Sequence, residues 1–342
     1  MRLLKRVLYL GYYLKGLDKA KYVAFSNYAA KAVKRPKWLL HLDAFWSVFR
    51  YNISLLEYFQ FRFFEKTAVE RSKWAGTGFM YEYQRFMNPV DKRQVLNDKT
   101  AFYKAYRPFF VHAVGDLEDL QQSDTLFQDL MANPSGKLVL KEAEGKCGLG
   151  VVILPLNQFK TKADLEIYMK KEGFDLVEGF IQQHSSLQAL SPSAVNTIRI
   201  FTQLTPSNEV VFLGCRLRIS VNSPVDNMAA GNMAAPIDES TGMVSGPGVY
   251  SDPSKGAEFT HPITGVPIVG FQIPHWETIK AMVTSAALHR RENLSIGWDV
   301  VVTEQGPGLI EGNHDWCKLV LQLPDSKGRK ELLENHWRAY AH

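Results

Sequence analysis

The sequence has few cysteines and no arrangement of them that would hold a zinc ion or a network of disulfides. Its three cysteines, Cys147, Cys215 and Cys317, are scattered over 342 residues with no C-x-x-C pair. A small, odd set of separated thiols is typical of a protein from a reducing compartment. We therefore expect a cytoplasmic protein, either free in solution or at the inner face of the membrane.

Long apolar runs are also absent. No 18 consecutive residues are apolar, so a transmembrane helix is not expected. The N-terminus combines a basic start with an apolar patch, but Lys15, Asp18 and Lys19 interrupt the patch and no convincing small-residue cleavage site follows. A signal peptide is therefore not expected.

Neither of two familiar nucleotide-binding motifs occurs, since the chain contains no GxxxxGK[ST] and no GxGxxG. A different glycine-rich stretch, 142–150 (EAEGKCGLG), lies between two apolar segments, 137–142 and 151–155, that read as strands. Such a hairpin tip can cover phosphates with its backbone N–H groups. On its own, a tip of this kind is more often a simple turn.

Positive charge is concentrated at one end of the chain. The net charge is +5, but residues 1–66 hold thirteen Lys or Arg against four Asp or Glu, which leaves that segment at +9 and the remainder at −4. An acidic partner of this end is expected. No nucleic-acid-binding module is recognisable, so nucleic acid is not expected as a partner.

The pattern along the chain predicts three parts. Residues 1–90 are expected to form a helical region, and sixteen aromatic side chains lie within residues 1–66, several at helical spacing. We expect them to pack on the neighbouring domain and to leave a basic surface beside the mouth of a cleft; the alternative is a membrane-surface element. Residues 91–175 are expected to form a smaller lobe, and residues 176–342 a larger one.

Several elements of the two lobes can be predicted. Helices are expected at 163–171, with Gly173 as the stop, and at 276–290 and 327–340. Strands are expected at 174–182, 196–204 and 209–221. The segment 223–270 is rich in Gly, Pro, Asn and Ser, and we expect a long or loosely ordered loop there.

Near the C-terminus, two short strands, 299–303 and 308–311, flank the turn-forming residues 304–307. With a turn centred near Gly306, Asp299 would lie opposite Asn313 and Val301 opposite Glu311. Asp299, Glu311 and Asn313 would then share one face, because side chains alternate along a strand. Two carboxylates and an amide oxygen suit Mg²⁺; the alternative is a solvated hairpin end with unconnected polar residues.

Three arginines fall on the strand pair 196–204 and 209–221. With the turn centred between Pro206 and Ser207, Arg199 would lie opposite Gly214, and Arg199, Arg216 and Arg218 would share one face. Neighbouring guanidinium groups repel one another unless an anion lies between them, which favours a phosphate or carboxylate ligand. The alternative is pairing with glutamates on an exposed surface.

Taken in order, these stretches resemble one family. LNDKTAFY, LVLKEAEGKCGLG, VEGFIQQH, SAVNTIRIFT, GCRLRIS, DNMAAGN, PIDESTG and IGWDVVVTEQGPGLIEGN, within residues 91–320, are similar to the ATP-grasp enzymes, and most closely to the sugar-transfer-associated group found with polysaccharide-assembly genes. The resemblance implies an α+β fold in which two lobes grip ATP and Mg²⁺, here preceded by the helical N-terminal region. The candidates that it implies for the acidic partner of that region are an acidic glycan, a nucleotide-sugar, an anionic membrane or glycosyltransferase machinery.

The resemblance also implies roles for residues. Lys99 and Lys141 would contact ATP phosphates, under a loop that includes Glu142, Gly145 and Gly148. The strand Glu178, Gly179, Phe180 and Ile181 would receive the adenine edge, Gln182, Gln183 or His184 would meet the ribose, and Asn196 would belong to the same cofactor site. Asp299, Glu311 and Asn313 match magnesium positions. Arg199 and Arg218, with Arg216 on the same face, would steady the phosphoryl group and the acceptor carboxylate, beside a substrate loop at 226–232 that is poorer in glycine than the family pattern.

The reaction implied by the resemblance is ATP-dependent ligation. A carboxylate would be phosphorylated to an acyl phosphate, and an amine such as an amino acid would displace the phosphate. The carboxylate would belong to an acidic sugar or other glycan substrate of surface-polysaccharide or capsule synthesis. Two alternatives stay open, a sugar or small-molecule kinase on the same fold and a non-catalytic nucleotide-binding subunit of a glycan-assembly complex. The metal-type residues argue against the second.

Overall fold

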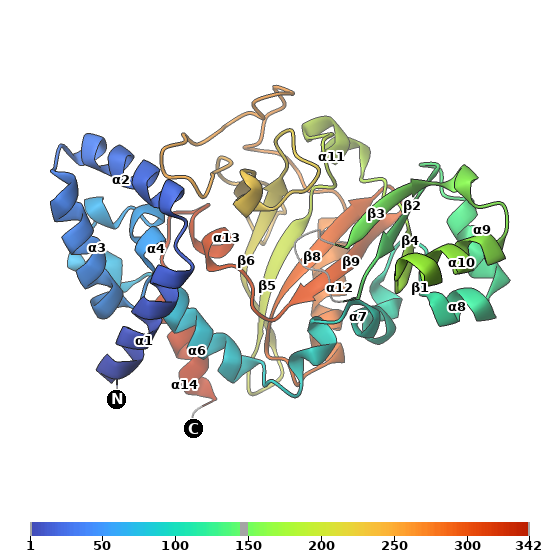
Figure 1. The fold of residues 1–342 in the computed structure, drawn as a ribbon, viewed down its shortest axis with the longest axis horizontal. Helices are drawn as coiled ribbons and strands as arrows, with labels where there is room; N and C mark the ends of the chain where they lie inside the picture. The colour runs from blue at the N-terminus through green and yellow to red at the C-terminus, as the bar shows by residue number, and fades with distance from the viewer. Residues whose placement is uncertain (1, 144–149, 341–342) are drawn as a thin grey trace.

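Two antiparallel sheets organise the chain, whose computed structural model describes residues 2–143 and 150–340. The smaller sheet has the order β1 (Val114–Asp116), β4 (Leu176–Gly179), β2 (Lys137–Lys141) and β3 (Val151–Pro155). The larger sheet has the order β7 (Met233–Ile237), β6 (Val210–Ile219), β5 (Ile198–Leu204), β8 (Ser295–Thr303) and β9 (Gly306–Asn313). Figure 1 shows the smaller sheet at one end of the molecule, the larger sheet in the middle and the N-terminal helices at the other end.

The smaller sheet is covered on one face. Leu138, Leu140 and Val177 point into a core formed with α8 (Leu117–Gln122), α9 (Asp124–Met131) and α10 (Lys162–Glu172). The predicted stop of α10 is confirmed, because Gly173 takes the left-handed conformation at its C-cap. By strand alternation, the other face carries Lys141 and Glu178.

The larger sheet is buried on both faces, as the uninterrupted burial of β5 indicates. One face packs Ile198, Leu217 and Trp298 against α12 (Trp276–His289). The other carries Phe201 and Leu213, which pack against α6 (Thr77–Met87), α13 (Lys318–Gln322) and α14 (Lys330–Ala339). Arg199, Arg218 and Asp299 lie on this second face, beyond its apolar part.

The predicted boundaries of the lobes are wrong at two places. β4 belongs to the smaller sheet, so that lobe extends to residue 179 rather than 175. The helix α7 (Lys99–Tyr106) packs Phe102 and Tyr106 into the core of the larger sheet and Tyr103 against the smaller sheet, so it joins the two lobes and does not belong to the smaller one alone. Burial of these aromatic side chains decides the assignment, and local sequence pattern does not reveal it.

The predicted long loop at 223–270 is confirmed in part, since no helix or strand lies between β7 and α12, but the segment is not loosely ordered. Isolated bridges join Ile237 to Val244, Gly248 to Glu258 and Thr260 to Pro267. Turn residues supply further contacts; the carboxylate of Asp238 accepts hydrogen bonds from the backbone N–H groups of Ser240 and Thr241. The Gly, Pro and Ser content therefore marks a series of tight turns.

The N-terminal region forms a helical unit with its own core. Its helices are α1 (Arg2–Lys15), α2 (Lys19–Val33), α3 (Lys37–Tyr51), α4 (Leu55–Gln60) and α5 (Ala68–Ser72). Buried aromatic side chains such as Phe25, Tyr58 and Phe63 pack on one another, and Leu319 and Leu323 from the later chain pack against them. The expectation that the aromatics pack mainly on the neighbouring domain is therefore wrong.

The basic turn between α2 and α3 lies at the opposite end of the long axis from the smaller lobe (Figure 1). The expected basic surface beside the cleft mouth is therefore not found there. A local excess of lysine and arginine predicts a charged surface, but only the packing of the helices decides where that surface lies.

The chain crosses between the two lobes near residue 111 and again at 180–184, and both crossings rest on the β8–β9 hairpin. At the first, a Cβ added to Gly308 would lie 2.7 Å from the backbone nitrogen of Val111, so only glycine allows this approach. At the second, the backbone N–H of His184 donates to the carbonyl of Val302 at 2.7 Å.

A buried ion pair joins the helical unit to the larger lobe. Glu57 is 2% exposed, and its carboxylate accepts from Lys318 Nζ at 2.7 Å and from the backbone and hydroxyl of Thr77. Burial opposes its ionisation, but Lys318 lowers the pKa of Glu57 below its ordinary value.

We predict that Glu57→Ala lowers the free energy of unfolding by about 3–5 kcal/mol, because it leaves a buried ammonium group without its carboxylate. Urea unfolding followed by circular dichroism measures the change. The control is Glu172→Ala, which removes the exposed pair with Lys171 and should stay within about 0.5 kcal/mol. Equal stability of the two variants would contradict the role of this pair.

Candidate functional site

The β8–β9 hairpin brings the three predicted metal-type side chains together, although in a different register. Asp299 lies opposite Glu311 and Gly297 opposite Asn313, with a bulge between Asp299 and Val300. The predicted pairing of Asp299 with Asn313 is therefore wrong by two residues, but a shift of two keeps each side chain on its face. Asn313 Nδ2 donates to Glu311 Oε1 at 3.1 Å, so the residues are connected and not a loose hairpin end.

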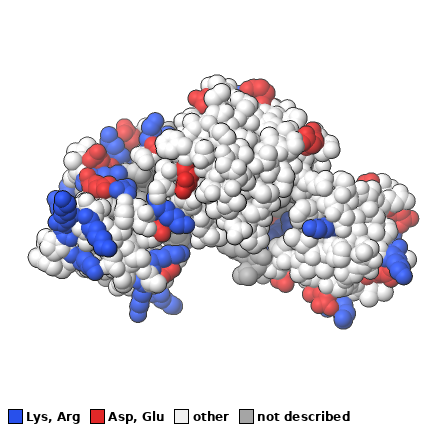
Figure 2. All heavy atoms as spheres, turned by 90° about the horizontal axis from the view of Figure 1, so that it is seen from above, with Lys and Arg blue, Asp and Glu red and all other residues white. Residues whose placement is uncertain are grey.

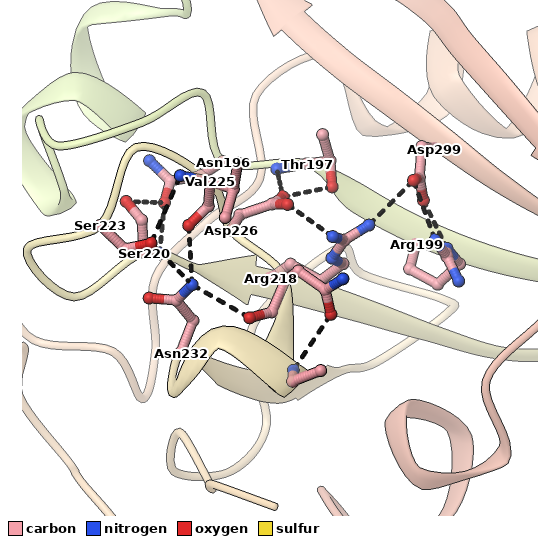
Figure 3. Close-up of polar contacts among 12 residues, drawn as sticks. Asn196, Thr197, Arg199, Arg218, Ser220, Ser223, Val225, Asp226, Asn232 and Asp299 are labelled. Carbon is pink, nitrogen blue, oxygen red and sulfur yellow. Dashed lines mark hydrogen bonds and ion pairs between the residues drawn. The ribbon is translucent and has the colours of Figure 1, made fainter. Parts of the chain in front are cut away.

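Two arginines hold Asp299. Arg199 lies directly opposite it on β5, donates Nη2 to Asp299 Oδ2 at 2.8 Å and donates Nε to Oδ1. Arg218 from β6 donates Nη1 to the same Oδ2 at 2.8 Å (Figure 3). Burial opposes ionisation of Asp299, but the two guanidinium groups hold the pKa of this carboxyl well below its usual range.

Arg218 also holds the loop that follows β6. Its Nη2 lies 2.6 Å from Asp226 Oδ1, and the other oxygen of Asp226 accepts from the backbone N–H of Thr197 at 2.9 Å. Asn232, at the end of the same loop, donates to the carbonyls of Val225 and Asn227 (Figure 3). The predicted substrate loop at 226–232 is thus joined to Asp299 through one arginine.

The expected cluster of three arginines does not form. Arg199 lies opposite Arg216 and not Gly214. The turn is centred on Ser207, which shifts the pairing by one residue, and the bulge after Phe201 adds the second. Arg216 turns away toward α13, where its Nη2 contacts Asp325 at 3.0 Å and the carbonyl of Leu321 at 2.5 Å. Only Arg199 and Arg218 therefore meet at Asp299, and Arg216 has a structural contact instead.

Glu311 lies opposite Asp299, and these two residues form an acidic pair that would suit a cation. Glu311 keeps contact with solvent although protein atoms surround much of it, and this partial burial together with the charge of Asp299 raises its pKa to about 7. Two close carboxyl groups resist double ionisation unless a positive charge lies between them. Within the described residues no group of three or more His, Cys, Asp and Glu side chains could hold a metal, so an Mg²⁺ site here would need the Asn313 amide oxygen, and the oxygen donors fit that ion.

The two predicted phosphate lysines lie near this acidic pair. Lys141 Nζ contacts Glu178 Oε2 at 2.7 Å, and Lys99 Nζ donates to the carbonyl of Glu142 at 2.7 Å. Burial and the neighbouring Lys141 lower the pKa of Lys99, while Glu311 and Glu178 are close enough to oppose that shift. Residues from the two lobes thus converge around one polar space.

The side chain of Glu178 binds Lys141, and the adenine edge expected at 178–181 stays a prediction. Its carboxylate lies between Lys141 and His112, whose Nε2 is 3.2 Å away. Burial opposes ionisation, but Lys141 and His112 lower the pKa of Glu178 to about 2. The backbone of the next residues is also engaged, because Gly179 N donates to Ala113 O and the carbonyl of Phe180 accepts from Asn133.

The predicted ribose contacts are mostly used within the protein. Gln183 is buried and exchanges hydrogen bonds with Asn196, Ser191 and Ala194, so Gln183 and Asn196 hold a loop together and do not face a ligand. His184 caps α11 (Ser185–Leu190) and contacts Glu304 at 3.3 Å. Gln182 is exposed and Ile181 half-buried. Gly145 and Gly148, like Cys147, lie outside the described residues.

Two residues of this network were not predicted as site residues. Asp226 lies in a loop whose sequence had been noted, but its contact with Arg218 depends on how that loop folds back. His112 has no motif around it and meets Glu178 only because β1 pairs with β4. Neither contact has a local signal in the sequence. A cavity of about 560 Å³ lies elsewhere, beside Tyr13 and Leu55 in the helical unit, so the candidate site is defined by its charges.

The sequence matches one family over most of its length. The family described as sugar-transfer associated ATP-grasp matches residues 79–337. No curated protein matches the sequence. Among solved structures, biotin carboxylase from Campylobacter jejuni is similar at 13% identity and a TM-score of 0.46, over 78% of this chain and 54% of that one. The ATP-grasp ligase PsnB is similar at 10% identity and a TM-score of 0.43, over 80% of this chain and 70% of that one. The chain spans 45% of the length of an N5-carboxyaminoimidazole ribonucleotide synthetase that it also matches, at 12% identity and a TM-score of 0.35 over 64% of this chain.

The acidic pair should make stability depend on pH in a defined direction. The pKa of Glu311 rises from 4.5 to about 7 on folding, so the folded protein retains a proton that the unfolded chain releases. Stability from this proton is complete below pH 4.5 and is lost as the pH rises through about 7.

We predict that Glu311→Gln, which mimics the protonated carboxyl, gains in melting temperature relative to the native protein between about pH 5 and about pH 8. Melting curves in the presence of a chelator measure the difference. The control is Glu304→Gln, because contacts with Ser185 lower the pKa of Glu304 below its ordinary value of 4.5. Its difference from the native protein should therefore be constant between about pH 5 and about pH 8 and change only at lower pH. A Glu311→Gln difference that is independent of pH would contradict the acidic pair.

Proposed function

Because the chain belongs to the sugar-transfer-associated ATP-grasp family, we propose that it is an ATP-dependent ligase that joins the carboxylate of an acidic sugar to an amine, such as an amino acid. The observation that carries the proposal is the convergence of Lys99, Lys141, Glu311 and the Arg199–Asp299–Arg218 group between two sheets. Phosphoryl transfer depends on positioning and on neutralisation of charge more than on a covalent nucleophile.

The reaction would proceed in two steps. First, a carboxylate oxygen of the acceptor attacks the γ-phosphorus of ATP, the bond to the β-phosphate oxygen breaks, and an acyl phosphate and ADP form. Second, the amine nitrogen attacks the acyl carbon, phosphate leaves, and the nitrogen loses a proton to give an amide. The first step activates a carboxylate that would otherwise not react with an amine in water.

Each part of the site has a place in this scheme. Lys99 lies on α7 and Lys141 lies on β2 of the smaller lobe. Both are suited to contact the phosphates of ATP. Arg199 and Arg218 are fixed by Asp299, so their remaining N–H groups are oriented toward an anion without a cost of reorganisation during the reaction. Asp299, Glu311 and Asn313 would hold Mg²⁺, which supplies charge neutralisation for the phosphates.

The proposal is tested by ADP release. The protein is incubated with Mg²⁺ and ATP and a matrix of amino acids against uronic acids and their nucleotide-linked forms, and products are identified by mass spectrometry. An amide product that requires both substrates supports the ligase. A phosphate ester formed without an amine would identify a kinase, and absence of turnover with ATP still bound would identify a non-catalytic nucleotide-binding subunit.

We predict that Lys141→Ala weakens ATP binding by about 2 kcal/mol, because a hydrogen bond from a charged group is worth roughly 1.5–3 kcal/mol. This corresponds to about thirtyfold in the dissociation constant, measured by calorimetry. The matched control is Lys170→Ala on the exposed side of α10. Unchanged affinity in Lys141→Ala would remove this lysine from the site.

The acidic pair gives a second prediction. Glu311→Ala should abolish Mg²⁺-dependent ADP release while the fold, followed by circular dichroism, survives, since Glu311 remains in contact with solvent. Normal turnover by the variant would show that the metal site lies elsewhere.

A further inference from the structure

The helix α3 has two apolar faces, and only one of them has a partner in the protein. Leu40, Ala44, Val48 and Tyr51 pack into the core of the helical unit. The opposite face is exposed and consists of Trp38 (62% exposed), Leu39 (41%), Leu42 (51%), Phe45 (42%) and Trp46 (68%). A helix with two apolar faces normally has both of them covered. We therefore infer that the exposed face of α3 is an interaction site.

Basic side chains border the apolar face. Lys31, Lys34, Arg35 and Lys37, at the end of α2 and the start of α3, are all exposed, as is Arg50 at the other end of α3. Within the described part of the chain, Lys31, Lys34 and Lys37 form no ion pair with an acidic side chain. Figure 2 shows Lys and Arg side chains gathered at the end of the molecule that the N-terminal helices form.

We propose that this docking face, made of the five apolar residues of α3 and the five basic residues beside them, binds the surface of an anionic lipid bilayer. Tryptophan and phenylalanine side chains partition to the boundary between headgroups and acyl chains. Lysine and arginine next to them are attracted by the negative potential of anionic lipids. The combination of the two on one convex helix matches a membrane surface in both respects.

The charges disfavour a second copy of the chain as the occupant. A symmetric dimer through this face would bring together two clusters of five cations from segments that each carry +9. Asp43 is the one acid of α3, and it is already paired with Arg71, so it does little to balance the repulsion. A bilayer-crossing helix is not the explanation either, because no helix among the described residues is long and apolar enough to span a membrane. The helix α3, with 15 residues, would lie along the surface.

Two parts of the docking face can be tested separately by sedimentation with vesicles. The full-length protein should bind vesicles that contain phosphatidylglycerol more tightly than vesicles of phosphatidylcholine alone, and binding should weaken steeply with salt. The combined variant Lys31→Gln, Lys34→Gln, Arg35→Gln and Lys37→Gln should lower the affinity for anionic vesicles on the order of a hundredfold. The variant Trp38→Ser and Trp46→Ser should lose the blue shift of tryptophan fluorescence that insertion produces.

Matched controls use exposed residues of the same kinds elsewhere. Phe259→Ser and Ile263→Ser alter two apolar side chains that are 65% and 61% exposed, and Lys170→Gln with Lys171→Gln removes two exposed charges from α10. These variants should bind vesicles like the native protein. ATP affinity should be unchanged in all four variants, which separates this test from that of the ligase.

Three outcomes would overturn the proposal. They are equal binding to neutral and anionic vesicles, docking-face variants that bind like the controls, and a dimer in analytical ultracentrifugation that the tryptophan variant abolishes. The last result would identify a second copy as the occupant. Circular dichroism of each variant confirms that a loss of binding does not come from unfolding.

Discussion

The carboxylate of Asp299 is held between two guanidinium groups, and the rest of the candidate site depends on this interaction. It fixes Arg199 across one strand pair and Arg218 across the next, and Arg218 in turn holds Asp226 and its loop. Loss of the carboxylate would leave the buried Arg199 without this partner and Arg218 with Asp226 alone, at a cost of several kcal/mol. The same carboxylate stands beside Glu311 and raises its pKa. One side chain therefore sets the geometry of the cations and the charge of the neighbouring acid.

The smaller lobe contains a similar arrangement, in which a buried carboxylate contacts two basic side chains. Glu178 is buried beside Lys141 and His112, so each sheet contains one ionised carboxylate whose main task is to orient cations. Groups that are already oriented need little rearrangement when a charged ligand arrives. The two carboxylates thus explain why a site that we propose binds phosphate also contains buried acids, which alone would repel phosphate.

The sequence could predict which side chains share a face but not their register or their direction. Each of the two important hairpins contains a bulge, after Asp299 and after Phe201, and both predicted pairings were wrong by two residues. The alternation of faces was still predicted correctly, because a shift by an even number of residues preserves it.

The direction of a side chain could not be predicted in the same way. Arg216 shares a strand face with Arg218, yet its side chain turns to Asp325. Gln183 and Asn196 show another limit, because a motif cannot reveal that an amide is already used by a loop. Long-range contacts such as Glu57 with Lys318 have no signal in local pattern.

The two crossings between the lobes limit how the smaller sheet can move. One is pinned where Val111 passes over Gly308, and the other where the N–H of His184 meets Val302. Both contacts are made by the hairpin that carries Asp299 and Glu311, and the line through the two contacts is an axis about which the smaller lobe could rotate. Rotation of the smaller lobe about that axis leaves both pins intact, whereas sliding would break the hydrogen bond and lift the chain from the glycine. The hairpin therefore favours rotation of the smaller lobe over sliding, and such a rotation would change the distance between Lys141 and the pair Asp299 and Glu311.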